Sequence, residues 1–429
     1  MTADKPTSVV PNLRFPKFRS TGHWHFQPLS GIAKLISDRV GTSKCVPMSV
    51  TTGVGLISQE EKFGRIIAGN SYKNYIRLQT NDFAYNKSAT KEFPQGYIAR
   101  YNGTGDAAVP NSIFTCFRPD AAAVIPEYLD HLLHGNHHGR WLRKYITVGA
   151  RAHGALSVSK DALMSMPVPL PPVAVSRPEQ KKIADCLGSL DDLIAADSQK
   201  LDSLRQHKQG LMQQLFPQLG KTVPRLRFPD FQNAGAWDEE KLDDLARRGT
   251  GHTPNKTIAE YYNGGIKWVS LADSKRMDNG LISETEIEIS EEGINNSSAV
   301  LHPAGSVILS RDAGVGKSAI IGCSMAVSQH FIVWTCEPTV LSNWFLYYQL
   351  QLLKPLFERI ATGSTIKTIG LPFFNAMRVT VPRLAEQHRI ADCLSMLDAR
   401  LAGQVQKIHA LKTYKQGLLQ QLFPPLESQ

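Results

Sequence analysis

The chain has 429 residues, of which 42% are hydrophobic and 20% are charged. This composition argues against a wholly disordered chain, and the length allows several domains of about 150 residues each. The 48 basic and 38 acidic residues leave a net charge of +10, which favours nucleic acid or an anionic surface as partner, although such a charge also serves solubility alone. No segment approaches the roughly 18 apolar residues of a membrane span, and no signal-peptide core is evident. A soluble cytoplasmic protein is expected.

The first recognisable element is a short segment that recurs later in the chain. Residues Val10–Phe18 read Val-Pro-Asn-Leu-Arg-Phe-Pro-Lys-Phe, and Val223–Phe231 read Val-Pro-Arg-Leu-Arg-Phe-Pro-Asp-Phe. We call these two stretches the leading segments. Gly22 and Trp24 recur at the same offset, as Gly235 and Trp237.

The two bodies that follow the leading segments have diverged from one another. Aromatic and β-branched residues bounded by Gly and Asn predict strands, and they occur at 97–101 and 113–117 in the first body and at 306–310 and 331–335 in the second. Helical stretches are predicted at Tyr128–Ile146 and Trp344–Ile360, each leading into a glycine turn at Gly149 or Gly363. Each body is therefore expected to be mixed α+β with a late helix. The proline-containing stretches Pro167–Pro172 and Val379–Pro382 predict stiff hinges at the end of each body.

Each hinge precedes one copy of a long repeat. Residues 179–217 and 386–424 align without a gap at an offset of 207, and 22 of the 39 positions are identical. Internal repetition of this kind predicts a duplicated unit with an approximate two-fold axis. Because the repeat is well preserved while the bodies differ, the sequence indicates a common frame that presents two different surfaces.

Apolar residues recur along each repeat at alternating steps of four and three, which is typical of a coiled-coil seam. The predicted seam residues are Ile183, Leu187, Leu190, Ile194, Leu201, Leu204, Leu211 and Leu215 in the first helix and Ile390, Leu394, Leu397, Leu401, Ile408, Leu411, Leu418 and Leu422 in the second. Polar residues interrupt both seams at matching steps, at Asp197 and Lys208 and at Gln404 and Lys415. If the second helix returns to cover the first, the two are antiparallel, and 39 residues span about 58 Å. The alternative is that each helix packs singly on its own body.

Asp197 and Gln404 allow two interpretations. Buried in the seam, they would fix the register of the helices. Rotated to the edge of the apolar stripe, they would simply face solvent.

The motifs that suggest catalysis are incomplete. Residues 311–318 end in Gly316-Lys317-Ser318, but Arg311 stands where a phosphate-binding loop needs its first glycine. An amino-methyltransferase would carry an Asn/Asp-Pro-Pro-aromatic loop, which the sequence lacks. His137-His138 has no third metal ligand at helical spacing, and the six scattered cysteines include no Cys-x-x-Cys pair. We expect neither a catalytic centre nor a metal site.

Basic, amide and aromatic side chains in probable loops are better candidates, because they suit phosphates and base edges. The candidate DNA-binding residues are Tyr72, Lys73, Asn86, Lys87, Arg140, Arg151, Lys256, Lys275, Arg311, Lys317 and Lys367. A basic cluster is also expected on the late helix of the first body, where residues 137–144 contain two histidines, two arginines and a lysine.

Both long repeats share the motif Glu-Gln-x-x-Ile-Ala-x-x-Leu, which closes on Lys-x-Gly-Leu-x-Gln-x-Leu-Phe. This doubled helix motif resembles the conserved regions of type I restriction–modification specificity subunits. The second body is similar to a target recognition domain at Thr253-Pro254, 261–269, 309–316 and 362–365, whereas the first body matches such motifs only loosely.

The resemblance implies a specific organisation. The fold would be α+β, with two globular target recognition domains in a pseudo-two-fold arrangement, joined by two long antiparallel coiled-coil helices. The recognition domains would be residues 1–174 and 218–384, and the spacer helices 175–217 and 385–429. Each domain would read one half-site of a bipartite double-stranded DNA target, and the spacer would set the gap between half-sites.

The family also implies partners for a chain that has no catalytic role of its own. Two modification subunits would methylate adenine N6 with S-adenosylmethionine, and restriction subunits would add ATP- and Mg²⁺-dependent translocation and cleavage. Two other hypotheses stay open at this point. One is a two-headed coiled-coil protein-interaction scaffold that does not read DNA, and the other is a nucleotide hydrolase built on Gly316-Lys317-Ser318.

Overall fold

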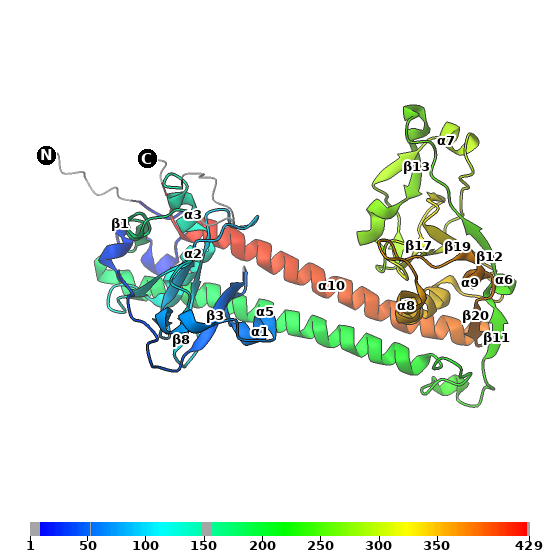
Figure 1. Ribbon diagram of the computed structural model, residues 1–429, viewed down its shortest axis with the longest axis horizontal. Coiled ribbons are helices and arrows are strands. Elements are labelled where there is room, and N and C mark those ends of the chain that lie inside the picture. The colour runs from blue at the N-terminus through cyan, green and yellow to red at the C-terminus, as the bar shows by residue number, and fades with distance from the viewer. Residues whose placement is uncertain (1–8, 52, 147–155, 427–429) are drawn as a thin grey trace. The chain divides into compact units, whose positions relative to one another are not determined.

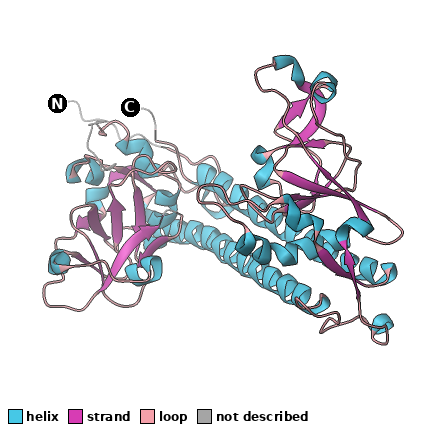
Figure 2. Cartoon of the chain, turned by 45° about the vertical axis from the view of Figure 1, so that its right-hand side comes forward, coloured by secondary structure: helices cyan, strands magenta, loops and turns pink. Residues whose placement is uncertain are grey.

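The structure, a computed structural model, describes residues 9–51, 53–146 and 156–426. The chain divides into two compact units: unit 1 comprises Met1–Ser198 and Gln406–Gln429, and unit 2 comprises Gln199–Val405. Each unit contains one body and parts of both long helices, α5 (Ser176–Leu215) and α10 (Leu384–Leu422) (Figure 2). Among the helices of the described residues, none combines the length and apolarity needed to cross a membrane.

The body of unit 1 contains two four-stranded sheets. The first has the order β2-β9-β6-β7, with strands Ala33–Leu35, Phe114–Pro119, Phe83–Asn86 and Tyr97–Arg100; the second has the order β4-β3-β8-β5, with strands Gly55–Ser58, Val46–Thr51, Ala107–Val109 and Ile76–Leu78. Figure 1 labels β3 and β8 of this body. Its short helices are α1 (Gln59–Phe63), α2 (Pro126–His134), α3 (His137–Leu142) and α4 (Lys160–Met164). Along β6, Phe83 and Tyr85 pack in the core that contains α2, whereas Ala84 packs in a separate core with residues of the second sheet. Both faces of this strand are therefore buried, as the period-two alternation of side chains requires.

The body of unit 2 also contains two sheets. The larger has the order β12-β19-β16-β17-β14, with strands Ala246–Thr250, Phe331–Cys336, Val307–Ser310, Ser318–Ile321 and Leu281–Ile282; the smaller has the order β15-β13-β18, with strands Ile287–Ile289, Tyr262–Val269 and Ala326–Val327. The helices are α6 (Leu242–Leu245), α7 (Glu291–Asn295), α8 (Asn343–Ile360) and α9 (Leu371–Asn375). Val307 and Leu309 of β16 pack in the core with α8, and Ile308 packs in the core with β18. The two bodies thus have a similar layered arrangement, although their sequences have diverged.

Two expectations about local structure are wrong. The helix predicted over Tyr128–Ile146 is broken into α2 and α3, because Asn136 adopts a left-handed backbone conformation (φ 58°) between them. The proline-containing stretches are not hinges but strands. Pro167–Leu170 forms β10, which pairs antiparallel with β1 (His25–Pro28), and Arg378–Val381 forms β20, which pairs with β11 (Asp238–Lys241). Each body therefore begins and ends in a two-stranded ribbon. Gly149 lies outside the described residues, whereas strands occur at all four predicted segments.

The same ion pair ties each leading segment to the start of a long helix. In unit 1, Arg14 donates to both carboxylate oxygens of Glu179, at 2.7 Å each, and to the carbonyl oxygen of Gly22. Both side chains are at least 95% buried. In unit 2, Arg227 makes the equivalent bidentate pair with Glu386. Such a pair needs both partners, because a single buried charge left alone is costly.

The glutamine that follows each glutamate holds the turn before the body's late helix. The Gln180 Oε1 accepts from the backbone N–H of Ile125, and the Gln387 Oε1 accepts from that of Ser342. The backbone of each leading segment is bound as well, because Leu13 N donates to Gln421 O in unit 1 and Leu226 N donates to Gln214 O in unit 2. We call this set of contacts the joint.

In each unit, the segments of α5 and α10 pair antiparallel, which confirms the arrangement expected from the sequence. In unit 1, Lys415 pairs with Asp191 and Lys407 pairs with Asp197. In unit 2, Lys208 pairs with Asp398. The residue numbers rise along one helix as they fall along the other, which only an antiparallel pair produces.

The predicted seam residues are all buried or half-buried, and most other positions of α5 and α10 are exposed. The ends of the seam enter the cores of the bodies, since Ile183, Leu187 and Leu422 pack in the core of unit 1 and Leu215, Ile390 and Leu394 pack in that of unit 2. Asp197 and Gln404 are 6% and 8% exposed, so these two positions belong to the seam and not to its solvent-facing edge.

Candidate nucleic-acid interface

Three loops converge at one edge of the body of unit 2. The first is the β16–β17 turn, residues 311–317, in which Ala313, Gly314 and Gly316 have positive φ. Its Arg311 N donates to His330 O at 2.9 Å, and the backbone N of Ile369 donates to Arg311 O at 2.9 Å. These bonds join the turn to residues 328–330 and 362–369, which form the other two loops.

Several predicted DNA-binding residues lie on these loops. Lys317 and Lys367 line a cavity of about 530 Å³, together with Lys354 and Glu358 of α8. The Lys317 Nζ donates to Ser274 Oγ and Ser274 O at 3.0 Å, which holds its side chain in place.

The other predicted residues of unit 2 are Lys256, Lys275 and Arg311. Lys256 and Lys275 are exposed, and Lys256 lines a second cavity of about 510 Å³. Arg311 is half-buried, and within the described residues its Nε is buried without a hydrogen-bond partner. The structure therefore brings Arg311, Lys317 and Lys367 together on adjoining loops, whereas Lys256 lines a neighbouring cavity.

The predicted residues of unit 1 are less concentrated. Lys73 and Arg140 are exposed. The hydroxyl of Tyr72 is bound at both sides by the backbone of Cys45, donating to its carbonyl oxygen and accepting from its N–H, so this side chain supports the fold. Asn86 accepts from the backbone N–H of Ser88.

The two remaining predicted residues of unit 1 are Lys87 and Arg151. Lys87 joins two segments through its backbone, donating to Ile113 O and accepting from Leu156 N. Arg151 lies outside the described residues.

The basic cluster expected on the late helix of unit 1 is wrong for its histidines. His137 and His138 are 3% and 0% exposed, and their Nε2 atoms bond to the carbonyl oxygens of Pro167 and Gly96. Burial lowers the pKa of each imidazole to about 4, since the charged form loses its hydration. Both side chains are neutral at neutral pH.

The phosphate-binding loop hypothesis also conflicts with the structure. Ser318 begins strand β17, which pairs antiparallel with β16, so residues 311–317 form a turn between two strands. A phosphate-binding loop instead leads into a helix whose N-terminus faces the phosphates. The Lys317 ammonium is already bound by Ser274.

Three functional candidates were not singled out by the sequence. They are Gln329 and His330, in the turn between β18 and β19, and Asp312. The Asp312 Oδ1 lies 2.6 Å from the His330 Nδ1. The available signal is weak: a polar pair placed between two apolar strand segments.

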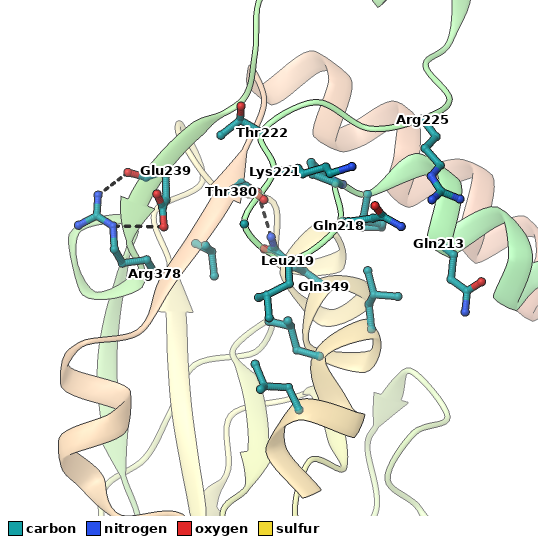
Figure 3. Close-up of a pocket in the computed structure, with 17 residues that line it drawn as sticks. Gln213, Gln218, Leu219, Lys221, Thr222, Arg225, Glu239, Gln349, Arg378 and Thr380 are labelled. Carbon is teal, nitrogen blue, oxygen red and sulfur yellow. Dashed lines mark hydrogen bonds and ion pairs between the residues drawn. The ribbon is translucent and has the colours of Figure 1, made fainter. Parts of the chain in front are cut away.

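A third cavity, of about 580 Å³, lies in unit 2 beside the joint (Figure 3). Its wall includes Leu352, Leu353 and Leu356 of α8 and the exposed Leu219. Figure 3 shows that the Arg378 guanidinium is bound to Glu239 and that the Gln349 amide is bound to Thr380. These polar groups stabilise the β11–β20 ribbon, so this cavity belongs to the frame.

The chain is similar to proteins of one kind. A family model described as type I restriction modification DNA specificity domain matches residues 235–413. The MjaIX specificity subunit of Methanocaldococcus jannaschii is 25% identical over 192 residues, which are 44% of this chain and 44% of that protein. The putative MjaX specificity subunit of the same organism is 22% identical over 311 residues, covering 71% of this chain and 68% of that one. The match therefore spans less than half the length of the first relative and about two thirds of the second.

Solved structures share the fold. A chain from a study of complex assembly and conformational transition of the type I R-M system has a TM-score of 0.60 at 17% identity, covering 93% of this chain and 97% of that one. The S subunit of a type I restriction-modification system from M. genitalium has a TM-score of 0.56 at 12% identity, covering 97% of this chain and 100% of that chain.

Proposed function

We propose that this chain is a type I restriction–modification specificity subunit, the subunit that reads DNA sequence in such a complex. Residues 1–174 and 218–384 act as target recognition domains, each reading one half-site of a bipartite double-stranded target. Residues 175–217 and 385–429 act as the spacer helices between them.

One observation carries this proposal: two joints with the same contacts hold two unlike bodies. Arg14–Glu179 and Arg227–Glu386 are equivalent pairs, whereas the loops beyond them differ in length and in side chains. In unit 2 these loops carry Lys317 and Lys367, which line one cavity, and the half-buried Arg311. Positive side chains bind phosphates, and amide groups beside them read bases. Two different reading surfaces on one frame suit an asymmetric bipartite site.

The chemistry is assigned to partners. Two modification subunits would methylate adenine N6 with S-adenosylmethionine, and restriction subunits would use ATP and Mg²⁺ for translocation and cleavage. This chain would be non-catalytic. Docking of partners on α5 and α10 is supported by large apolar side chains on the outer faces of these helices, since Leu193, Met396, Val405 and Tyr414 are 40% to 60% exposed.

The test is DNA binding by the full chain as a function of salt. Contacts to about 6–10 phosphates predict an affinity loss of about 10³–10⁵ between about 50 and 200 mM salt, since bound counterions are released. A flat salt response would instead favour the protein-interaction scaffold.

A second experiment separates the two bodies. Residues 24–166 of unit 1, which include β1 and end just before β10, are exchanged for the corresponding body of a relative, and the methylated sites of the complex are mapped. We expect one half-site to change and the other to persist. A change in both halves would contradict the assignment of one half-site to each body.

A further inference from the structure

We propose that Gln329 selects an A·T base pair in the half-site read by unit 2, held in its reading orientation by Thr253 and flanked by His330. This inference rests on the proposed function and deepens it by naming the base and the side chains. Gln329 is exposed at the turn between β18 and β19, and it lines the 510 Å³ cavity together with Thr253, Lys256 and His330.

The amide of Gln329 has a defined orientation. The Thr253 hydroxyl donates to Gln329 Oε1. This bond uses one lone pair of the oxygen and directs the NH₂ group to the other side. The remaining lone pair and the two N–H donors form the pattern that pairs with N6 and N7 of adenine in the major groove.

Thr253 is itself held closely against the sheet. His252 N donates to Val327 O at 3.0 Å, and the Tyr262 hydroxyl donates to Pro254 O at 2.7 Å. At Gly251 the backbone comes so near β18 that a Cβ would lie 1.8 Å from Val327 O. A side chain with a backbone this constrained can position its neighbour before DNA binds.

His330 presents a second polar group beside Gln329. Its Nδ1 lies 2.6 Å from Asp312 Oδ1, and a carboxylate at this distance fixes Nδ1 as the protonated nitrogen. Nε2 of the neutral ring is then a hydrogen-bond acceptor. Asp312 is placed by its own turn, where Ser310 Oγ donates to its carbonyl oxygen at 2.6 Å. An acceptor next to the amide matches the exocyclic amino groups of adenine and cytosine and disfavours the O6 of guanine and the O4 of thymine.

Lys256 supplies the charge that brings this polar pair to DNA. It is exposed and lines the same cavity. A cation next to uncharged reading groups is the division of labour in which phosphate contacts position a protein and base contacts specify the sequence.

The experiment is enrichment of binding sites from a randomised duplex pool by the full chain and its variants, followed by sequencing. In Gln329→Ala, the preference for adenine at one position of one half-site should fall from on the order of 10- to 100-fold to none. Thr253→Val should reduce the preference at that same position, and Thr253→Ser should restore it. Gln218→Ala, an exposed glutamine beside the joint, is the matched control and should leave every position unchanged.

The outcomes are distinguishable. If the wild-type chain enriches no bipartite motif, the proposed function fails. If it enriches one and Gln329→Ala leaves every base preference intact, or weakens all sequences equally, this inference is wrong while the proposed function stands. Thermal unfolding of each variant verifies that the body is folded.

Discussion

Unit 1 and unit 2 are alike at their joints and unlike in the loops beyond them. Arg14 and Glu179 in unit 1 make the same bidentate pair as Arg227 and Glu386 in unit 2. By contrast, the late helix of unit 1 is broken at Asn136, whereas α8 of unit 2 runs over 18 residues. A buried ion pair tolerates little change, because either partner alone is a buried charge, whereas an exposed loop tolerates much. The comparison distinguishes the contacts that both units share, which hold the frame, from the parts of the bodies that differ.

The largest expected effect comes from breaking a joint. Glu179→Gln and Glu386→Gln should each destabilise their own unit by about 3–5 kcal/mol, since an arginine is left buried without its carboxylate. Hydrogen exchange measured by mass spectrometry would localise the loss of protection.

The control for the joint is Lys181→Ala, which removes an exposed pair with Asp185 and should not change stability measurably. A loss of protection confined to the same unit for both glutamate variants would break the equivalence of the two joints.

Unit 1 should lose more stability in acid than unit 2. Burial lowers the pKa of His137 and His138 in unit 1 to about 4. Between pH 6.5 and 4 the unfolded chain binds protons that the folded chain does not, so stability falls as the pH falls through this window, by about 2 kcal/mol per histidine at pH 5. His134, whose pKa is raised by Asp130, opposes this loss in part.

Hydrogen exchange at pH 7 and pH 5, corrected for intrinsic rates, measures this difference. In unit 2 burial also lowers the pKa of His302, so some loss of protection is expected there as well. Equal loss in both units would contradict the assignment of the acid-sensitive groups to unit 1. A His137→Gln variant should be less sensitive to acid than the wild type.

A smaller effect is expected at the ion pairs between the long helices. Lys208 pairs with Asp398 in unit 2, and the Tyr348 hydroxyl donates to the same carboxylate at 2.8 Å. Lys415 pairs with Asp191 in unit 1, where the carboxylate is more exposed. Lys208→Met should therefore cost about 1 kcal/mol, and Lys415→Met less. Thermal unfolding of the two variants side by side would test this order. A larger drop in Tm for Lys415→Met than for Lys208→Met would contradict it.

The smallest effect concerns single phosphate contacts. Lys73→Ala in unit 1 and Lys275→Ala in unit 2 should each weaken binding to all DNA sequences alike and lower the slope of log K against log salt by about 0.9. Titrations at several salt concentrations would measure both slopes. A change of base preference in either variant would indicate that the lysine contacts a base and not a phosphate.

Much of the frame is predictable from the sequence because it depends on patterns of period 3.5 and 2. The seam steps fix which faces of α5 and α10 meet, and alternating apolar residues mark strands such as β16 and β19. The joint is different: Arg14 and Glu179 are 165 positions apart, and no periodicity joins them. The sign in the sequence is recurrence: an arginine occupies the same position in both leading segments, and a glutamate opens both long repeats.

The candidate interface was less predictable because residue type does not reveal burial. His137 and His138 look basic in the sequence, yet the Nε2–H of each donates to a backbone carbonyl oxygen in the core of unit 1. Tyr72 is a predicted DNA-binding residue, yet its hydroxyl is hydrogen-bonded to the backbone of Cys45. Conversely, Gln329 and Thr253 are 76 positions apart and become a pair only when the chain between them folds β18 against the loop that contains Thr253.

The ion pairs between α5 and α10 have an evolutionary consequence. Lys208 and Lys415 occupy the same step of the repeat, as do Asp191 and Asp398, and each lysine meets the aspartate of the opposite copy. A symmetric dimer of one half-length ancestor would make these two bonds identically. Fusion of two copies of its gene would keep both bonds and would let the two bodies diverge. Under the proposed function, a protein that reads two identical half-sites would then evolve into one that reads two different half-sites.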